Sequence, residues 1–170
     1  MTPYISTPRL IVYELTKASS FAADSLVEQI PNILSESVVA NLPPHFHEIA
    51  NTKQASAWLE LMLSESRLFV VKSREGIFIG FIFISENDAK EKHIGYLLAE
   101  AYWGKGLAYE LLKAFLNHVK QAEPWLVLVG GVDKHNIASA KLLLKLGFQL
   151  RRSTNNYVDF YELHLKKAYM

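Results

Sequence analysis

The chain has 170 residues, of which half are apolar and 21% are charged, and this composition indicates one compact domain and excludes a largely disordered protein. It contains no cysteine, which excludes disulfides, thiolate metal sites and a cysteine nucleophile. With 18 basic and 17 acidic residues, the formal charge is only +1, so the phosphate-dominated binding of nucleic acids is not expected.

The first third of the chain is predicted to be helical and rich in loops. Residues 9–15 have the composition of a strand, and Thr16 is a candidate N-cap for a helix that runs through Phe21. Pro31 is expected to end that helix. After a second short helix and a loop with two prolines, Thr52 is expected to open an amphipathic helix.

The middle of the chain is predicted to form strands and one long helix. Residues 67–73 and 77–85 are dense in Phe, Val and Ile and are separated by a short turn, which indicates an antiparallel hairpin. A third strand is expected at 93–98. Residues 104–121 have apolar side chains every three or four positions, which is typical of an amphipathic helix.

The last third predicts a buried strand, a helix and a strand pair. Residues 126–132 are wholly apolar, as in a central strand, and a helix is expected at 136–146. Strands at 148–152 and 157–165 are expected to meet at a turn of Asn155-Asn156. The order predicts an α/β fold (α+β) with helices on both faces of a largely antiparallel sheet.

The sequence gives no sign of a membrane segment. Its longest apolar run, residues 77–84, is too short to span a bilayer, and no basic region leads into an apolar core at the start. No repeat or linker divides the chain. We therefore expect one soluble cytoplasmic domain over residues 1–170, with no membrane or nucleic-acid partner.

Gly104-Lys105-Gly106 lies where a predicted strand leads into a helix. Glycines let a ligand approach the backbone, and the free N–H groups of a helix start attract phosphate, with Lys105 as an added cation. The alternative is a tight turn without a ligand. A Rossmann site is disfavoured because its third glycine would fall at Tyr109, and the P-loop pattern is absent.

A second motif gives this turn a context. Residues 136–148 contain the pattern N-x-x-S followed by Gly-Phe, and residues 103–108 read WGKGLA. With both motifs in this order, the chain resembles the GCN5-related N-acetyltransferases (GNAT), whose pyrophosphate loop is Q/R-x-x-G-x-G/A. The opening Thr7-Pro-Arg9-Leu10 and the pair Gly95-Tyr96 resemble, more narrowly, the Rim-type branch that acetylates ribosomal proteins.

The resemblance implies a GNAT-like sheet with one splayed strand pair and an acyltransferase that uses acetyl-CoA. The acetyl group would pass to a primary amine by direct attack, and no G-x-S-x-G elbow supports an acyl-enzyme. Backbone groups of one strand would hold the pantetheine arm, a loop would hold the pyrophosphate, and a helix start would hold the arm from the other side. The strand residues are Tyr96, Leu97 and Leu98. The loop residues are Trp103, Gly104, Lys105, Gly106, Leu107 and Ala108, and the residues at the helix start are Asn136 and Ser139.

The chain departs from the family pattern at two positions. Trp103 stands where the loop usually has Gln or Arg, and Leu143 stands seven residues after Asn136, where many relatives have a tyrosine thought to protonate the thiolate. Helical spacing puts Asn136, Ser139 and Leu143 on one face. The resemblance to the Rim-type branch implies Ser139 as the general acid, and the alternative is a hydroxyl that caps the helix or contacts the pantetheine arm. His93 is the candidate base, with proton removal through water as the alternative.

The acceptor stays open at this point. A protein N-terminus, such as that of a ribosomal protein, is the leading hypothesis; a small amine (polyamine, amino acid or antibiotic) and a catalytically silent acetyl-CoA-binding module are the alternatives, and a homodimer is compatible with the sequence. No metal is expected, because His45 and His47 lack a third ligand nearby. Glu36, Glu48 and Glu86 are candidates to attract an ammonium group or are simply solvated.

Overall fold

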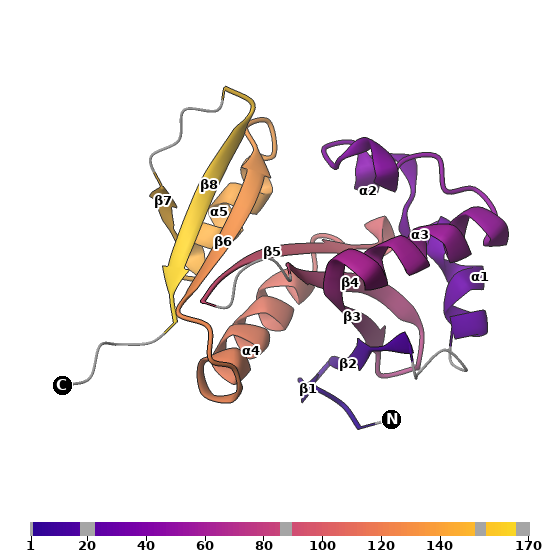
Figure 1. The fold of residues 1–170 in the computed structure, drawn as a ribbon, viewed down its shortest axis with the longest axis horizontal. Helices are drawn as coiled ribbons and strands as arrows, with labels where there is room; N and C mark the ends of the chain where they lie inside the picture. The colour runs from indigo at the N-terminus through magenta and orange to yellow at the C-terminus, as the bar shows by residue number, and fades with distance from the viewer. Residues whose placement is uncertain (1, 18–22, 86–89, 152–155, 166–170) are drawn as a thin grey trace.

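The computed structural model describes residues 2–17, 23–85, 90–151 and 156–165 (Figure 1). The strands are β1 (Ile5–Ser6), β2 (Leu10–Leu15), β3 (Ser66–Ser73), β4 (Phe78–Ser85), β5 (Glu91–Leu98), β6 (Val127–Asp133), β7 (Gln149–Arg151) and β8 (Val158–His164). The helices are α1 (Ala23–Ile33), α2 (Glu36–Val39), α3 (Thr52–Glu65), α4 (Leu107–Ala122) and α5 (Ile137–Lys145), with 3₁₀ turns at Pro44–Phe46 and Glu100–Tyr102. This order confirms the predicted α/β class.

The strands form one sheet in the order β1-β2-β3-β4-β5-β6-β8-β7. Every neighbouring pair of described strands is antiparallel except β5 and β6, which are parallel. That parallel pairing covers only residues 91–93 and 127–129, whereas β5 stays paired with β4 as far as Leu98. Figure 1 shows β5 and β6 separating beyond this point, so the expected splay is confirmed.

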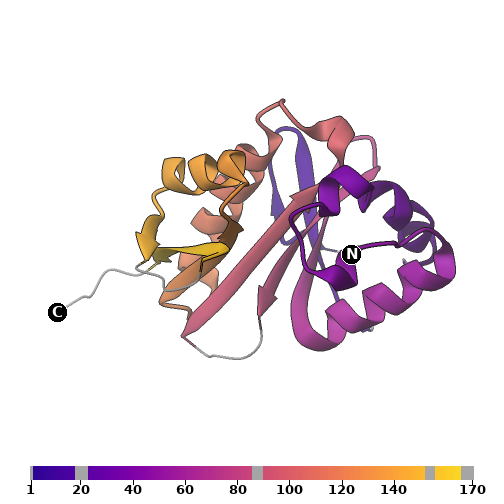
Figure 2. The same cartoon turned by 90° about the horizontal axis from the view of Figure 1, so that it is seen from above.

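Helices cover both faces of the sheet, and the strand side chains alternate between them. On β4, Phe81 packs against Trp58 of α3, while Ile82 lies in the core beneath α4. Helices α1, α2 and α3 share the first core, and α4 and α5 share the second. Figure 2 shows the two helical layers on either side of the strands.

Helix α1 does not end at Pro31 as predicted but continues to Ile33. Proline has no N–H to donate to the preceding turn, yet Ile33 and Leu34 are 2% and 4% exposed, and their burial offsets that loss. The N–H of Leu34 also bonds to Ile30 O at 2.9 Å. Phe21 and Asn155, which the sequence placed in a helix and a turn, lie outside the described residues.

Helix α4 starts at Leu107, three residues later than predicted. Gly104 and Gly106 adopt left-handed backbone angles, which cannot continue a right-handed helix, so they form a turn before it. The helix buries one apolar stripe and exposes the other side. Within the described ranges, neither α4 nor any other helix has the length and apolar character needed to cross a bilayer.

Candidate donor-binding site

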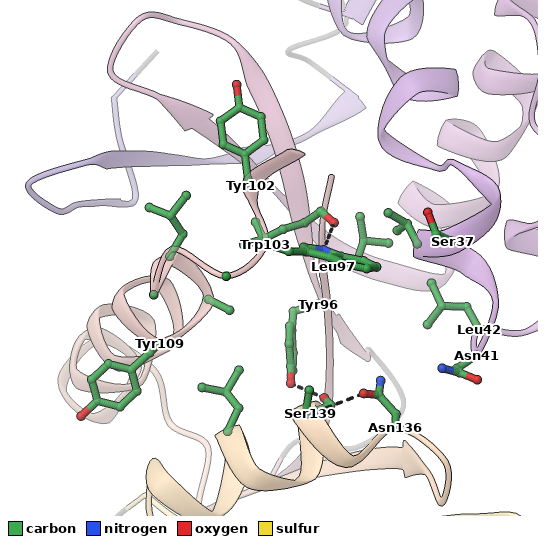
Figure 3. Close-up of a pocket in the computed structure, with 18 residues that line it drawn as sticks. Ser37, Asn41, Leu42, Tyr96, Leu97, Tyr102, Trp103, Tyr109, Asn136 and Ser139 are labelled. Carbon is green, nitrogen blue, oxygen red and sulfur yellow. Dashed lines mark hydrogen bonds between the residues drawn. The ribbon is translucent and has the colours of Figure 1, made fainter. Parts of the chain in front are cut away.

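A cavity of about 550 Å³ lies beside the part of β5 that has separated from β6 (Figure 3). Of the residues predicted to bind the donor, all except Lys105 line it. None of the described residues that line it has a charged side chain. The lining residues are Ser37, Val38, Asn41, Leu42, Tyr96, Leu97, Leu98, Tyr102, Trp103, Gly104, Gly106, Leu107, Ala108, Tyr109, Asn136, Ala138, Ser139 and Leu142.

The turn before α4 presents backbone to this cavity. Gly104 and Gly106 have φ angles of +72° and +76°, in the region that glycine favours. A Cβ atom at Gly104 would meet nothing within 4 Å, so the space above it is open. The hydrogen-bond ladder of α4 begins with the N–H of Glu110, which donates to Gly106 O at 3.1 Å. The N–H groups of residues 107–109 precede that bond and have no partner within the ladder.

These features fit a diphosphate group. Free amides and the positive end of the helix dipole attract an anion without a charged side chain, and the open space above Gly104 admits it. The Nζ atom of Lys105 lies 5.5 Å from the centroid of the Tyr102 ring, and Lys105 does not line the cavity. The contact of Lys105 with the phosphates therefore stays a prediction. The features that suit a diphosphate belong to the backbone of the turn.

The end of β5 offers unpaired peptide groups to the same cavity. The N–H of Ala99 donates to Ile79 O, and in an antiparallel pair the direction of these bonds alternates, so the peptide groups of Leu97 face β4. Those of Tyr96 and Leu98 face the gap. The Leu98 carbonyl accepts a hydrogen bond from Trp103 Nε1 at 2.8 Å. Of the predicted stretch 96–98, Leu97 thus lines the cavity without free backbone groups.

The hydroxyls of Tyr96 and Ser139 form a hydrogen bond at one wall of the cavity (Figure 3). Ser139 is held in place by its own N–H, which donates to Asn136 Oδ1 at 3.1 Å and so caps α5. Burial raises the pKa of Tyr96, and the contact with Ser139 lowers it by less, so the phenol stays protonated at neutral pH. From the sequence, Tyr96 was predicted to bind the donor through its backbone, and the contact of its phenol with Ser139 was not predicted.

Leu143 does not line the cavity, although it follows Ser139 by four residues, about one turn, in α5. Its side chain is 1% exposed and lies in the core, where a Cβ atom at Gly130 would be only 3.1 Å from Leu143 Cδ1. Leu142 lines the cavity instead. Asn136 is the N-cap of α5 and precedes its first helical residue, Ile137.

His93 lies outside the cavity lining. Its backbone N–H donates to Ser85 Oγ at 2.8 Å, and its exposed ring lies edge-on to Phe160 with 6.4 Å between the centroids. It shares a strand face with Leu97, four residues away, which is roughly 13 Å along the strand. A role as base would therefore need an acceptor or a water chain that extends along β5, and it stays a prediction.

The other candidate histidines and carboxylates have ordinary surroundings. His47 Nε2 hydrogen-bonds Leu42 O at 2.8 Å, and the His45 ring lies on Phe46. In the part of the chain that the structure describes, no three His, Asp or Glu side chains are grouped to hold a metal ion. Glu36 and Glu48 are exposed and do not line the cavity. Glu86 lies outside the described residues.

The sequence matches the family model for the acetyltransferase (GNAT) domain over residues 11–149. No match was found among curated proteins. The matched range contains β3, β4 and β5, the glycine turn, α4 and α5, and therefore most of the cavity lining.

Solved structures share the fold at low sequence identity. A GNAT-family acetyltransferase from Bacillus anthracis superposes with a TM-score of 0.72 and 16% identity, covering 96% of this chain and 99% of that chain. RimL, a ribosomal L7/L12 alpha-N-protein acetyltransferase in complex with coenzyme A, has a TM-score of 0.73 and 14% identity over 96% and 98% of the two chains. The ribosomal-protein-S5-alanine acetyltransferase from Vibrio fischeri has a TM-score of 0.67 and 16% identity over 94% and 95%.

The family match, the splayed strands and the anion-binding turn agree with one another. Since the family model spans the elements that build the cavity, the chain belongs to the GNAT family of N-acetyltransferases, enzymes that use acetyl-CoA.

Proposed function

We propose that this enzyme acetylates the α-amine of a protein N-terminus, with a ribosomal protein as the leading candidate. The acceptor amine has to reach the thioester in the donor cavity, and the observation that carries the proposal is that none of the described residues lining this cavity has a charged side chain. A free amino acid would bring a carboxylate, and a polyamine would bring further ammonium groups, and neither would find a counter-charge there. A peptide N-terminus brings neutral amide groups behind its amine.

The same lining favours an amine that loses its proton easily. At pH 7 roughly one-seventh of α-amines are neutral, given a pKa near 7.8, against less than about 0.1% of lysine side chains with a pKa near 10.4. Neither a carboxylate nor an imidazole lines the cavity to remove a proton directly. An α-amine needs the least help, and water, with His93 as its terminal base, suffices for it. The fold shared with RimL and the S5-alanine acetyltransferase supports this acceptor class.

On the donor side, the amides at the start of α4 would hold the diphosphate of acetyl-CoA, and the peptide groups of Tyr96 and the N–H of Leu98, which face the gap, would pair with the pantetheine arm as a strand does. Asn136 would contact the arm from α5. Acetyl-CoA is a substrate that supplies an activated thioester. Trp103 in place of the usual Gln or Arg then matters little for the phosphates, because its indole bonds to Leu98 O.

In this proposal Ser139 is the general acid, and Tyr96 supplies the proton that Ser139 loses. The amine nitrogen attacks the carbonyl carbon, the C–N bond forms, and the C–S bond breaks with its electron pair on sulfur. Ser139 gives its hydroxyl proton to that sulfur and takes the phenolic proton of Tyr96. The phenolate regains a proton from water, and the proton of the amine leaves to water or to His93. The two hydroxyls would thus protonate the thiolate, the role attributed in many relatives to a tyrosine at the position of Leu143.

The test is a panel of acceptors with acetyl-CoA, in which the release of free thiol is followed. A peptide with a free N-terminus is compared with the same peptide N-terminally blocked but containing lysine, with spermidine and with free amino acids. Thiol release with the free N-terminus alone is expected. Release with spermidine or amino acids instead would contradict the acceptor proposal, and coenzyme A binding without release from any amine would indicate the silent module.

A further inference from the structure

Arg9 contacts the donor-binding turn from 96 residues away in the sequence. It lies immediately before β2, and its Nη1 donates to Lys105 O at 2.9 Å. Its Nε donates to Glu110 Oε1 at 2.8 Å, and its backbone N–H donates to Glu110 Oε2 at 3.0 Å. One side chain therefore connects the middle of the turn to the first turn of α4.

The direction of the Lys105 carbonyl fixes the direction of the next amide. In a trans peptide, the C=O of one residue and the N–H of the following residue point to opposite sides, and no cis peptide occurs among the described residues. Arg9 binds the Lys105 carbonyl, and Lys105 does not line the cavity whereas Gly106 does, which is consistent with a carbonyl that faces away from the cavity. In that orientation the N–H of Gly106 faces the cavity side.

We propose that Arg9 is a positioning residue for donor binding, which holds the Lys105–Gly106 peptide so that its N–H faces the diphosphate. The proposal rests on the proposed role of this turn as the diphosphate site. Left-handed glycines leave the turn free to rotate this peptide, so an external bond is needed to select one orientation. The Nη2 of Arg9 lies 3.7 Å from where a Gly106 Cβ would stand, on the outer side of the turn.

Glu110 anchors the arginine. Thr7 Oγ1 donates to Glu110 Oε2 at 2.6 Å, and Thr7 itself is buried. Burial alone would raise the pKa of Glu110, but the hydrogen bonds from Thr7 and Arg9 outweigh it and hold the pKa below its usual value. The carboxylate is therefore charged and balances the guanidinium. Because the pair is neutral, Arg9 acts on the donor through geometry and not mainly through its charge.

The experiment compares donors with and without a diphosphate. Values of kcat/KM are measured with acetyl-CoA and with S-acetylpantetheine for the wild type, Arg9→Ala, Arg9→Lys and the control Arg151→Ala. Arg151 also bonds two carboxylates, Glu91 and Glu162, but does not contact the turn. Coenzyme A binding is measured by calorimetry on the same proteins.

For Arg9→Ala, kcat/KM with acetyl-CoA is expected to fall about ten-fold through KM, since one charge-assisted hydrogen bond is lost, while the value with S-acetylpantetheine stays within about two-fold. Arg9→Lys keeps the charge beside Glu110 and the fold, but a lysine lacks the planar fork and should show the same donor-selective loss. Arg151→Ala should match the wild type.

Equal losses with both donors in the Arg9 variants, or no loss with either, would overturn the positioning role. A separate outcome tests the site itself. If the wild type uses S-acetylpantetheine as well as acetyl-CoA and binds pantetheine as tightly as coenzyme A, the turn does not hold a diphosphate, and the donor site proposed above fails along with the role of Arg9.

Discussion

The N-terminal region (described residues 2–85) and the C-terminal region (described residues 90–165) use different means to define their structure. In the C-terminal region, the cavity is built from main-chain groups: left-handed glycines, free helix amides and unpaired strand peptides. In the N-terminal region, aromatic packing dominates, with Trp58 against Phe46, Phe81 and Phe83 at centroid distances of 5.2 to 6.1 Å.

The difference shows why one region is recognisable from a short motif and the other is not. Main-chain recognition needs glycine at fixed positions, since only glycine tolerates those angles without cost. Aromatic packing accepts many combinations of similar volume. Matched substitutions in the two regions can therefore separate effects on the donor from effects on folding.

The largest contrast is expected between two phenols. Tyr96→Phe and Ser139→Ala should each lower kcat about 100-fold with little change in the KM for acetyl-CoA, because each removes part of the proton donor. The double variant should be no worse than either single one. Tyr4→Phe removes a hydrogen bond of 2.8 Å to Glu123 away from the cavity and should leave kcat unchanged. Rapid-quench kinetics measures the chemical step, and multiplying losses would contradict a shared role.

Leu143→Tyr tests whether the tyrosine of many relatives can be restored here. The side chain points into the core against Gly130, so the larger ring should destabilise the fold by about 1–3 kcal/mol without raising kcat. Leu144→Tyr is the control, because Leu144 is 52% exposed on the same helix. Urea denaturation gives the free energies of unfolding. A stable and faster Leu143→Tyr enzyme would refute this placement of the side chain.

Two glycines offer a matched pair of backbone substitutions. Gly104 and Gly76 have φ angles of +72° and +86°, and a Cβ atom at either would meet nothing within 4 Å. Alanine should cost about 1–2 kcal/mol of folding free energy at both positions, since both need left-handed angles. Calorimetry with coenzyme A should show roughly ten-fold weaker binding for Gly104→Ala only. Similar affinity in both variants would remove the turn from the donor site.

Alkaline pH should destabilise the protein through the same two phenols. Burial raises the pKa of Tyr4 first, with the Glu123 contact adding to it, and burial also raises the pKa of Tyr96. Above pH 10 the unfolded chain therefore loses phenolic protons that the folded chain keeps, and stability falls by up to about 1.4 kcal/mol per pH unit for each phenol. Below pH 10 this contribution is fully retained. The dependence of unfolding free energy on pH, measured by denaturation from pH 9 to 11.5, should be flatter for Tyr4→Phe and for Tyr96→Phe than for the wild type.

The smallest effect is expected at Trp58. Its Nε1 is buried without a hydrogen-bond partner among the described residues, so phenylalanine removes an unfavourable N–H as well as some packing. The two changes should nearly cancel, within about 1 kcal/mol. Trp103→Phe is the counterpart, since it loses the bond to Leu98 O and should raise the KM for acetyl-CoA. Thermal melts and initial rates distinguish the two, and a large destabilisation by Trp58→Phe would point to a missing partner.

Much of this organisation could be predicted from local patterns. The hairpin of β3 and β4, the amphipathic α4 and the glycine turn follow from spacing of apolar residues and glycines within single segments. Asn136 and Ser139 were found because the pattern N-x-x-S followed by Gly-Phe lies within one short segment and resembles the family motif. These interactions are short in sequence, so a single chain is enough to see them.

What the sequence could not predict depends on packing between distant segments. The phenol of Tyr96 meets Ser139 across 43 residues, and Arg9 meets Lys105 across 96, and no local pattern encodes either contact. Pro31 was expected to end α1, but the burial of Ile33 is a tertiary effect. Leu143 packs in the core against Gly130 of β6, and the spacing of residues along α5 does not encode that contact.

The short parallel ladder between β5 and β6 has a mechanical consequence. Only three residue pairs join β5 to β6, the two strands at which the halves of the sheet meet, so the enzyme without its donor should bend at this ladder. A donor arm lying beside Tyr96 and Leu98 would act as a missing strand and stiffen the hinge. Resistance to proteolysis and slow amide exchange near β6 should then rise with coenzyme concentration, so that the enzyme is most durable when its acetyl donor is abundant.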